Sequence, residues 1–187
     1  MIRVIGGSAK GRRLSSFRDI TVRPTSEKVR GAVFDILQGY FPFKRAVDIF
    51  AGTGAMGIEA LSRGVAETVF IDSNPDVVSL IRKNLEKCGF SAKAKVLKMD
   101  AINAIELFIN KGERFDLIFI DPPYDDSLTL RVLERIDTNG ILSPGAMVVS
   151  ESSKRMVIEG KLNSMELFKR KRYGDTVVSF YRAVSEG

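Results

Sequence analysis

The chain has 187 residues, which fits one domain, and 44% of them are hydrophobic, which is enough for one sizeable core. It contains no histidine and one cysteine, Cys88, so the sequence excludes histidine general bases, histidine-ligated metals, an internal disulfide and a cysteine-cluster zinc site. No apolar run reaches the length of about 18 residues that a membrane-spanning helix needs, and the N-terminus lacks an apolar signal region. These features predict a cytoplasmic, metal-free protein in which Cys88 is a half-buried helix residue.

The net charge of +6 is concentrated at the N-terminus. Residues 1–30 contain eight basic and two acidic side chains, whereas the rest of the chain contains 21 of each kind. Such a segment is either a solvated surface or an arm that contacts phosphates. The motifs described below favour the phosphate-contacting arm.

The first 40 residues are predicted to form a small extension. Residues 2–5 and 12–17 can pair as a short β-hairpin across a glycine-containing turn. A helix is then expected, capped by Thr25 or Ser26 and ending near Gly39.

From residue 46 onward, strand-like and helix-like runs alternate. Strands are expected at residues 46–51, 68–72, 94–99, 116–121 and 146–151, and helices at 57–63, 75–88, 101–110 and 127–136. Short strands that are continuously apolar are typical of a parallel sheet with helices on both faces. The last two strand-like runs, 165–173 and 176–183, are joined by Gly174-Asp175, which predicts an antiparallel hairpin.

This order of elements predicts an α/β, Rossmann-like fold with a mostly parallel seven-stranded sheet that ends in an antiparallel hairpin. We expect residues 1–187 to form a single domain, in which residues 1–40 are the basic extension and residues 41–187 are the catalytic core.

A glycine loop follows the first strand of the core. Residues 52–57 read Gly-Thr-Gly-Ala-Met-Gly, the pattern G-x-G-x-x-G, and Asp72 ends the next strand. Glycines let the backbone approach a ligand closely, and a carboxylate at the tip of the second strand can bind ribose hydroxyls. The loop therefore predicts a nucleoside-containing cofactor, either NAD or S-adenosylmethionine.

Three features favour S-adenosylmethionine over NAD. Asp48 precedes the loop, and an anion there suits a sulfonium amino acid better than a pyrophosphate. Asp100-Ala101 follows the third strand, where Asp100 can bind an adenine amino group, cap the next helix, or do both. The chain also lacks the separate substrate domain that dehydrogenases usually carry. The predicted cofactor-binding residues are Asp48, Ala51, Gly52, Gly54, Asp72, Asp100, Ala101 and Asp121.

Asp121-Pro122-Pro123-Tyr124 follows the fourth strand, where ligands of open α/β sheets bind. The exocyclic amine of a base is a poor nucleophile because its lone pair is delocalised into the ring. The Asp121 carboxylate and the Pro122 carbonyl can accept its two hydrogens and expose that lone pair, while Tyr124 stacks on the ring. These three are the predicted catalytic residues, and the target base must be unpaired or flipped out of a helix. Without the cofactor loop, the turn would indicate only a proline-marked loop.

Several segments are similar to those of a known family. They are Arg3-Val4-Ile5-Gly6-Gly7, Gly11-Arg12-Arg13-Leu14, Arg23-Pro24-Thr25, the loop at residues 48–54, the turn at residues 121–124 and Tyr173-Gly174-Asp175-Thr176. Together they resemble the bacterial small-subunit ribosomal RNA guanine-N2 methyltransferases, the RsmD family, nearly end to end.

The resemblance implies methylation of one guanine N2 in 16S rRNA, with S-adenosylmethionine as cofactor and a partly assembled small-subunit particle as substrate. We expect the protein to act as a monomer. The basic extension would then contact RNA. The cations expected to do so are Lys10, Arg12, Arg13, Arg23, Lys28 and Arg30. If the extension is only a solvated segment, the basic run at residues 169–172 is the alternative RNA surface.

Three other functions stay open from the residues alone. A DNA adenine-N6 methyltransferase shares the catalytic turn, but the chain lacks room for a target-recognition domain. A non-catalytic RNA-binding assembly factor would not need Asp121 and Tyr124. An NAD-linked reductase would share the glycine loop.

Overall fold

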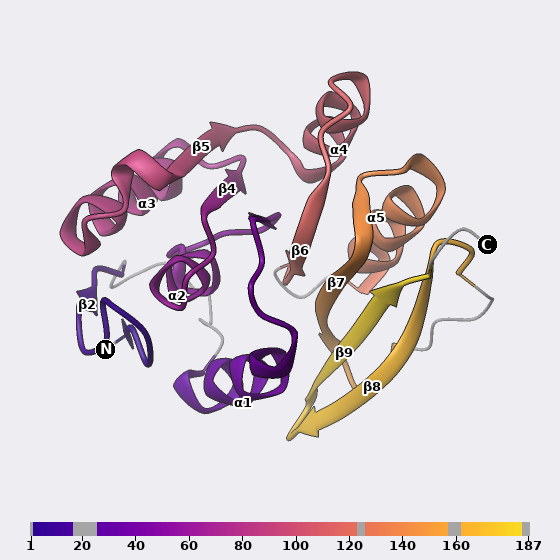
Figure 1. Ribbon diagram of the computed structural model, residues 1–187, viewed down its shortest axis with the longest axis horizontal. Helices are drawn as coiled ribbons and strands as arrows, with labels where there is room; N and C mark the ends of the chain where they lie inside the picture. Colours follow the sequence, from indigo (N-terminus) through magenta and orange to yellow (C-terminus); the bar gives the residue numbers. More distant parts are fainter. Residues whose placement is uncertain (1, 17–25, 123–125, 157–161, 185–187) are drawn as a thin grey trace.

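The protein is an α/β structure built around one large sheet (Figure 1). A computed structural model describes residues 2–16, 26–122, 126–156 and 162–184. The sheet has seven strands in the order β5-β4-β3-β6-β7-β9-β8. The parallel strands are β3 (Arg45–Asp48), β4 (Glu67–Asp72), β5 (Ala94–Lys98), β6 (Phe115–Ile120) and β7 (Leu142–Ser153).

The sheet ends in the antiparallel hairpin of β8 (Met165–Tyr173) and β9 (Thr176–Ala183). The predicted Rossmann-like fold is therefore confirmed. β7 is the element that differs most from its predicted range, because it begins at Leu142 instead of residue 146. Phe115 of β6 pairs with Leu142 of β7, and Leu117 pairs with Met147. The register therefore shifts between these two pairs, because β7 carries extra residues there.

Helices cover both faces of the sheet (Figure 1). They are α1 (Glu27–Leu37), α2 (Ala55–Ser62), α3 (Pro75–Cys88), α4 (Ala101–Asn110) and α5 (Asp126–Asn139), with short 3₁₀ turns at Gln38–Tyr40 and Ser91–Lys93. Apolar side chains of α4 and α5 pack on one face, and those of α1, α2 and α3 belong to clusters on the other. The two faces together bury the strands, which explains their continuous apolar sequence.

Local signals set the ends of α3 where they were predicted. The Asn74 side chain caps the helix by accepting hydrogen bonds from the backbone N–H groups of Asp76 and Val77, at 2.8 and 3.4 Å. Pro75 occupies the first helical position, and Gly89 ends the helix in a left-handed conformation with φ of 75°. Cys88, in the last turn, is buried in an apolar cluster, and burial raises the pKa of its thiol.

The basic extension is packed onto the core. β1 (Ile2–Arg3) and β2 (Arg13–Leu14) form the expected antiparallel hairpin, although each is only two residues long. Ser26, one of the two predicted caps, accepts a hydrogen bond from the backbone N–H of Val29 at 3.2 Å. Apolar side chains of the hairpin share a buried cluster with α2 and α3. The extension is therefore anchored along its hairpin.

Two adjacent glycines let the extension lie close against the end of α2. A Cβ atom at Gly7, whose φ is 74°, would lie 1.8 Å from the carbonyl oxygen of Ser62. A Cβ at Gly6 would lie 2.6 Å from the guanidinium of Arg63. The Ser62 carbonyl instead accepts a hydrogen bond from the backbone N–H of Ser8 at 2.8 Å. At Gly7, where the clash is with backbone atoms and φ is positive, only glycine permits this approach, whereas at Gly6 the flexible end of Arg63 can move aside.

In the part of the chain that the structure describes, no helix is both long and apolar enough to cross a membrane.

Candidate active site

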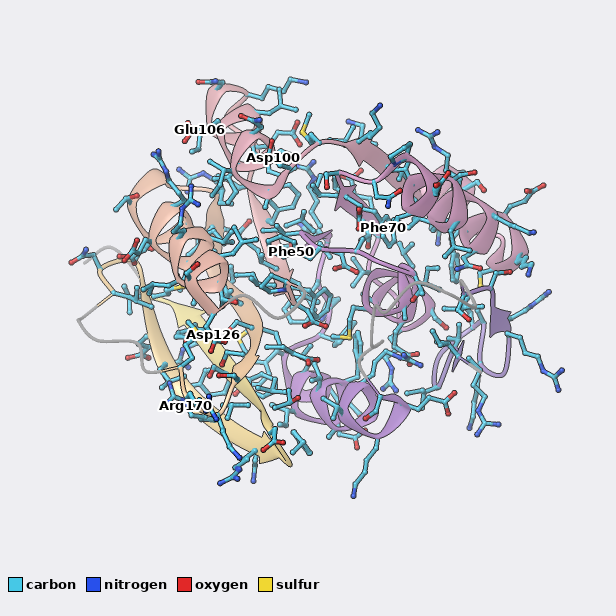
Figure 2. All side chains as sticks on the ribbon, turned by 180° about the vertical axis from the view of Figure 1, so that it is seen from behind. Phe50, Phe70, Asp100, Glu106, Asp126 and Arg170 are labelled. Carbon is cyan, nitrogen blue, oxygen red and sulfur yellow. The ribbon has the colours of Figure 1, made fainter. Side chains whose placement is uncertain are left out.

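A cavity of about 1210 Å³ lies at the carboxyl ends of the parallel strands. Four predicted carboxylates line it, from Asp48, Asp72, Asp100 and Asp121. They come from the ends of four different strands, as expected for a ligand site of an open α/β sheet. Figure 2 shows Asp100 at the start of α4 and Asp126 at the start of α5. The tertiary structure thus brings the predicted cofactor and catalytic motifs to one site.

The glycine loop forms one wall of this cavity. Gly52 and Gly54 have φ values of 51° and 77°, a left-handed region that favours glycine. Ala51 and Gly52 line the cavity as predicted. Gly54 does not, because its backbone N–H turns back to the Ala51 carbonyl at 2.6 Å and the residue caps α2. Gly54 therefore shapes the turn, and its contact with a cofactor stays a prediction.

The third glycine of the loop brings α2 against the sheet. A Cβ at Gly57 would lie 2.3 Å from the ring of Phe70 in β4, so no larger residue fits without displacing the ring. The backbone N–H of Gly57 donates to the Oδ2 atom of Asp48 at 3.1 Å. The close packing of α2 and the position of Asp48 therefore depend on the same glycine.

Asp48 is the most deeply buried carboxylate of the cavity, with 2% of its surface exposed. Burial raises the pKa of its carboxyl group to about 7, against the opposing effect of the Gly57 N–H. The neighbouring carboxylates of Asp121 and Asp72 raise this pKa further. A cationic ligand placed among these three groups would favour their ionised forms. This electrostatic environment matches the positively charged sulfonium and ammonium groups of S-adenosylmethionine.

Asp72 is held by the backbone on either side of it. Its Oδ2 accepts the N–H of Gly52 at 3.2 Å, and its Oδ1 accepts the N–H of Asn74 at 3.0 Å. Desolvation raises the pKa of this carboxyl group, and these hydrogen bonds oppose the rise. Each oxygen keeps further acceptor capacity towards the cavity, which suits a pair of ribose hydroxyls.

Asp100 has the helix-capping role that the sequence left open. Its Oδ1 accepts the backbone N–H of Asn103 at 3.0 Å at the start of α4, and this bond is the main reason why the pKa of Asp100 is lowered. Both Asp100 and Ala101 also line the cavity. Capping holds the carboxylate at the cavity edge, so the two predicted roles are compatible.

The catalytic turn begins at the end of β6. Asp121 is half-buried, Pro122 is buried, and both line the cavity beside the glycine loop. Pro123 and Tyr124 lie outside the described residues, as does Arg23 of the extension. The position of Asp121 supports its predicted role, whereas stacking by Tyr124 stays a prediction.

Comparison with known proteins identifies the family. A family model described as Conserved hypothetical protein 95 matches residues 2–182. The ribosomal RNA small subunit methyltransferase D of Escherichia coli is 30% identical over 100% of this chain and 92% of that protein. The chain belongs to this family. The resemblance to the RsmD family is thus confirmed nearly end to end.

Two further matches agree with the assignment to the RsmD family. A putative rRNA methyltransferase of Bacillus subtilis, YlbH, is 32% identical over 97% of this chain and 98% of the relative. The solved structure of a putative methyltransferase from Escherichia coli, yhhF, is 28% identical, covers 99% of both chains and has a TM-score of 0.85. The shared fold therefore extends from the N-terminal hairpin to the C-terminal one.

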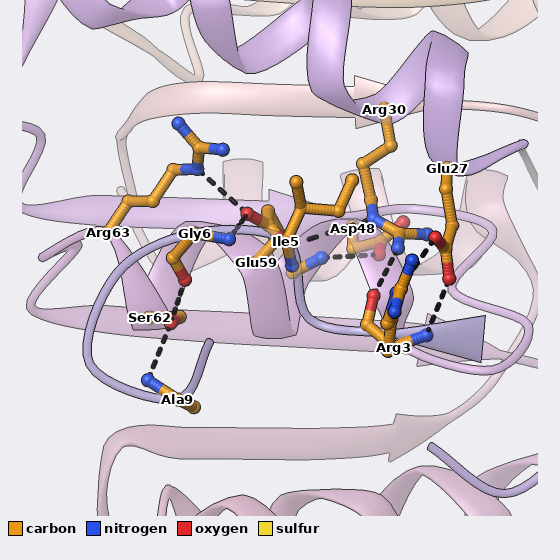
Figure 3. Close-up of polar contacts among 11 residues, drawn as sticks. Arg3, Ile5, Gly6, Ala9, Glu27, Arg30, Asp48, Glu59, Ser62 and Arg63 are labelled. Carbon is orange, nitrogen blue, oxygen red and sulfur yellow. Dashed lines mark hydrogen bonds and ion pairs between the residues drawn. The ribbon is translucent and has the colours of Figure 1, made fainter. Parts of the chain in front are cut away.

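One of the cations predicted to bind RNA is inside the protein. Arg30 on α1 is 1% exposed, and burial lowers the pKa of its guanidinium. Its Nη2 donates to the carbonyl oxygen of Arg3 at 2.5 Å, and its Nε lies 3.7 Å from the Oε2 of Glu59 (Figure 3). The prediction for Arg30 is therefore wrong, because its charge is used to hold the extension against α2.

Glu59 is the centre of this buried network. It is fully buried on α2 and accepts the backbone N–H groups of Ile5 and Gly6 at 2.7 and 2.8 Å (Figure 3). It also accepts the Nε of Arg63 at 2.8 Å. Glu59 belongs to α2, the helix that begins at the glycine loop. It therefore fixes the extension next to the wall of the cavity that carries the glycine loop, Asp48, Asp72 and Asp100, which we call the cofactor wall.

The other described cations of the predicted RNA-binding set are exposed. Lys10, Arg12 and Arg13 lie on the hairpin, and the Nη1 of Arg12 donates to the carbonyl of Lys87 at 3.4 Å. Lys28, at the start of α1, lines the cavity. Their contact with RNA stays a prediction.

Asn84 is a positioning residue that the sequence reasoning missed. It is fully buried on α3, accepts the backbone N–H of Ser15 at 2.7 Å and donates to the Ser15 carbonyl at 3.0 Å. The same amide donates to the carbonyl of Thr53 in the glycine loop at 2.9 Å. Asn84 thus joins the extension to the cofactor wall. The sequence does contain a sign of this role: Asn84 is a polar amide on the apolar face of α3, next to Ile81 and Leu85.

Proposed function

We propose that this protein transfers a methyl group from S-adenosylmethionine to ribosomal RNA, and that the acceptor is the exocyclic N2 amine of a guanine in the small-subunit rRNA. The observation that carries the proposal is the convergence of Asp48, Asp72, Asp100 and Asp121 on one cavity. The names of the relatives, putative rRNA methyltransferase and ribosomal RNA small subunit methyltransferase D, support RNA as the substrate.

The residues of the cavity fit S-adenosylmethionine from end to end. Asp72 would accept the ribose hydroxyls, and Asp100 with Ala101 would border the adenine. The buried Asp48 would face the cationic part of S-adenosylmethionine. The same carboxylate would repel the anionic pyrophosphate of NAD. When bound, S-adenosylmethionine supplies the electrophilic methyl group.

Asp121 and Pro122 would prepare the acceptor amine. The Asp121 carboxylate and the Pro122 carbonyl each accept one hydrogen of the amine, which turns its lone pair away from the ring and towards the methyl donor. The Asp121 carboxylate can also accept the proton that the methylated amine must lose. Orientation and electrostatic stabilisation supply the rate enhancement, so no covalent enzyme intermediate is needed. Tyr124 would stack on the base and hold its plane.

The same proposal assigns parts of the chain to parts of the task. Residues 1–40 are the RNA-contacting extension and residues 41–187 the catalytic core of one domain, acting as a monomer on 16S rRNA within a small-subunit particle. The contacts of Asn84 and Glu59 support this division, because they fix the extension beside the cofactor wall.

The test is methyl transfer to rRNA extracted from cells that lack the protein, with radiolabelled S-adenosylmethionine and mass analysis of the nucleosides. We expect one N2-methylguanosine in the small-subunit rRNA. N6-methyladenosine as the product would favour the adenine-directed alternative, and no transfer to free rRNA or to small-subunit particles would overturn the proposal. Calorimetry with S-adenosylmethionine and with NAD tests the cofactor separately, and heat of binding only with NAD would contradict it.

A further inference from the structure

The cavity presents an electrostatic problem for an RNA substrate. Besides the carboxylates of the cofactor wall, Asp126, Glu151 and Asp175 line it. RNA carries one negative charge per nucleotide, so its approach to a cavity with this lining is opposed unless cations at the entrance offset the field.

Three exposed cations from separate elements line the same cavity. They are Lys28 on α1, Arg131 on α5 and Arg172 at the end of β8. None of them forms a contact ion pair with any residue that the structure describes. Arg131 and Arg172 lie far in sequence from the basic extension.

A hydrogen bond to the backbone holds the guanidinium of Arg172 in place. Its Nε donates to the carbonyl oxygen of Gly174 at 2.8 Å, which fixes one side of the guanidinium and leaves both Nη groups to donate elsewhere. The nearby Asp175 is already engaged, because its Oδ1 accepts the Nζ of Lys154 at 2.5 Å. A planar guanidinium with two unused Nη groups is well suited to bidentate binding of a phosphate.

A further cation continues this surface along the edge of the sheet. β8 is an edge strand of the sheet. Because side chains alternate between the two faces along a strand, Arg170 lies on the same face as Arg172, at a spacing of about 7 Å. Arg170 is exposed, and its Nε lies 3.3 Å from the hydroxyl of Ser179. Figure 2 shows Arg170 on the side of the molecule where α5 begins at Asp126.

We propose that Arg131 and Arg172, together with Lys28, form a phosphate-binding rim around the slot for the target base, and that Arg170 extends this rim along β8. The rim holds the sugar-phosphate backbone of single-stranded RNA beside the flipped nucleotide. The inference rests on the proposed function and adds the cations of α5 and β8 to the RNA surface, to which Lys28 of the extension already belongs.

A matched pair of double variants tests the rim. Arg131→Gln/Arg172→Gln removes two cavity-lining cations. Arg135→Gln/Arg182→Gln removes the same charge from α5 and β9, at side chains that pair with Glu106 and Glu166 at 3.2 and 2.9 Å and do not line the cavity. All four side chains are exposed, so both variants should fold, which thermal denaturation checks.

The measurement is binding of a fluorescein-labelled oligouridylate by anisotropy over a series of salt concentrations. Each lost contact to a single-stranded phosphate removes roughly 0.7 from the slope of log affinity against log salt, so the rim variant should lose about 1.4. The control variant should keep the wild-type slope, and S-adenosylmethionine affinity should not change in either. A rim variant that keeps the wild-type slope would overturn the inference.

Methyl transfer by the wild-type protein separates the two proposals. If the wild type methylates rRNA and the rim variant shows a higher KM for rRNA with the same methylated nucleotide, both stand. If the wild type methylates rRNA but the two double variants bind oligouridylate alike, only the rim fails. If the slope depends on the rim but the wild type transfers no methyl group to any rRNA preparation, only the proposed function fails.

Discussion

The two sides of the cavity are built in different ways. On the side of the glycine loop, Asp48, Asp72 and Asn84 are held by backbone hydrogen bonds or hold the backbone themselves. On the side of α5 and β8, Arg131 and Arg172 are exposed and make few internal contacts. The difference fits the two ligands that we propose. A small cofactor gains affinity from side chains that are held in place before it binds, whereas a long polyanion such as RNA would be bound by exposed side chains that can adjust to its backbone.

The largest expected effect concerns Asp121, which lies where the two sides meet. If its carboxylate orients the amine, Asp121→Ala should lower kcat by two or more orders of magnitude, about 3 kcal/mol or more. Affinities for S-adenosylmethionine and for RNA should change much less than kcat, because Asp48, Asp72 and Asp100 still line the cofactor site and the exposed cations are retained. Single-turnover kinetics measure the loss, and Asp76→Ala at the exposed start of α3 is the control. Full activity of the Asp121 variant would refute the catalytic role.

Asp72 tests the fixed wall alone. Asp72→Ala should weaken S-adenosylmethionine binding by roughly 1.5–3 kcal/mol, because charged hydrogen bonds to the ribose are lost. The salt slope of RNA binding should stay at the wild-type value. Calorimetry measures the first quantity and anisotropy the second. An unchanged cofactor affinity would mean that Asp72 only supports the turn through Gly52 and Asn74.

Asn84 tests whether the wall depends on the extension. Asn84→Asp keeps the size of the side chain but removes both N–H donations, to Thr53 and to Ser15, which should destabilise the folded protein by about 1–3 kcal/mol. Cofactor affinity should fall as well, since the Thr53 carbonyl loses its partner. Glu86→Gln on the exposed face of α3 provides the matched control. Lost stability with unchanged cofactor affinity would limit Asn84 to a structural role.

Asp48 gives the fixed wall a pH dependence. Its pKa in the folded protein is raised to about 7, so between its ordinary pKa and about 7 the folded state binds more protons than the unfolded state. The free energy of unfolding of the ligand-free protein should therefore fall as the pH rises through this window, by up to about 1.4 kcal/mol for each pH unit. Asp48→Asn should flatten this dependence in urea titrations. An identical pH profile for variant and wild type would contradict the raised pKa.

The smallest effect is expected from the exposed hairpin of the extension. If four cations of the extension and the two arginines of the rim contact single-stranded phosphates, the slope of log affinity against log salt is near −4, at roughly 0.7 for each contact. Replacement of Lys10, Arg12 and Arg13 by alanine should flatten it by about 2, with cofactor binding and the methylated nucleotide unchanged. An unaltered slope would leave RNA binding to the rim of Arg131 and Arg172.

Much of the fold could be predicted because its signals are local. The range of α3 follows from Asn74, Pro75 and Gly89, which lie next to the helix ends that they define. The carboxylates of Asp48, Asp72, Asp100 and Asp121 could be predicted in the same way, because each lies at the end of a strand or within two residues of it. β7 was less accessible to prediction, since its early start depends on the pairing of Leu142 with Phe115 of β6, beyond an irregularity in β7 itself.

The sequence by itself determined which strands and helices follow one another along the chain, where the glycine turn lies and which residues stand at the strand ends. Each of these features depends on neighbouring residues in the chain. Only the tertiary structure decided how charges and amides are used. Arg30 is buried through contacts with Arg3 and Glu59, more than twenty residues away in either direction. Lys28, Arg131 and Arg172 meet at one cavity although a hundred residues separate the first two. Composition counts such groups, but only packing determines which carboxylate, carbonyl or ligand each one meets.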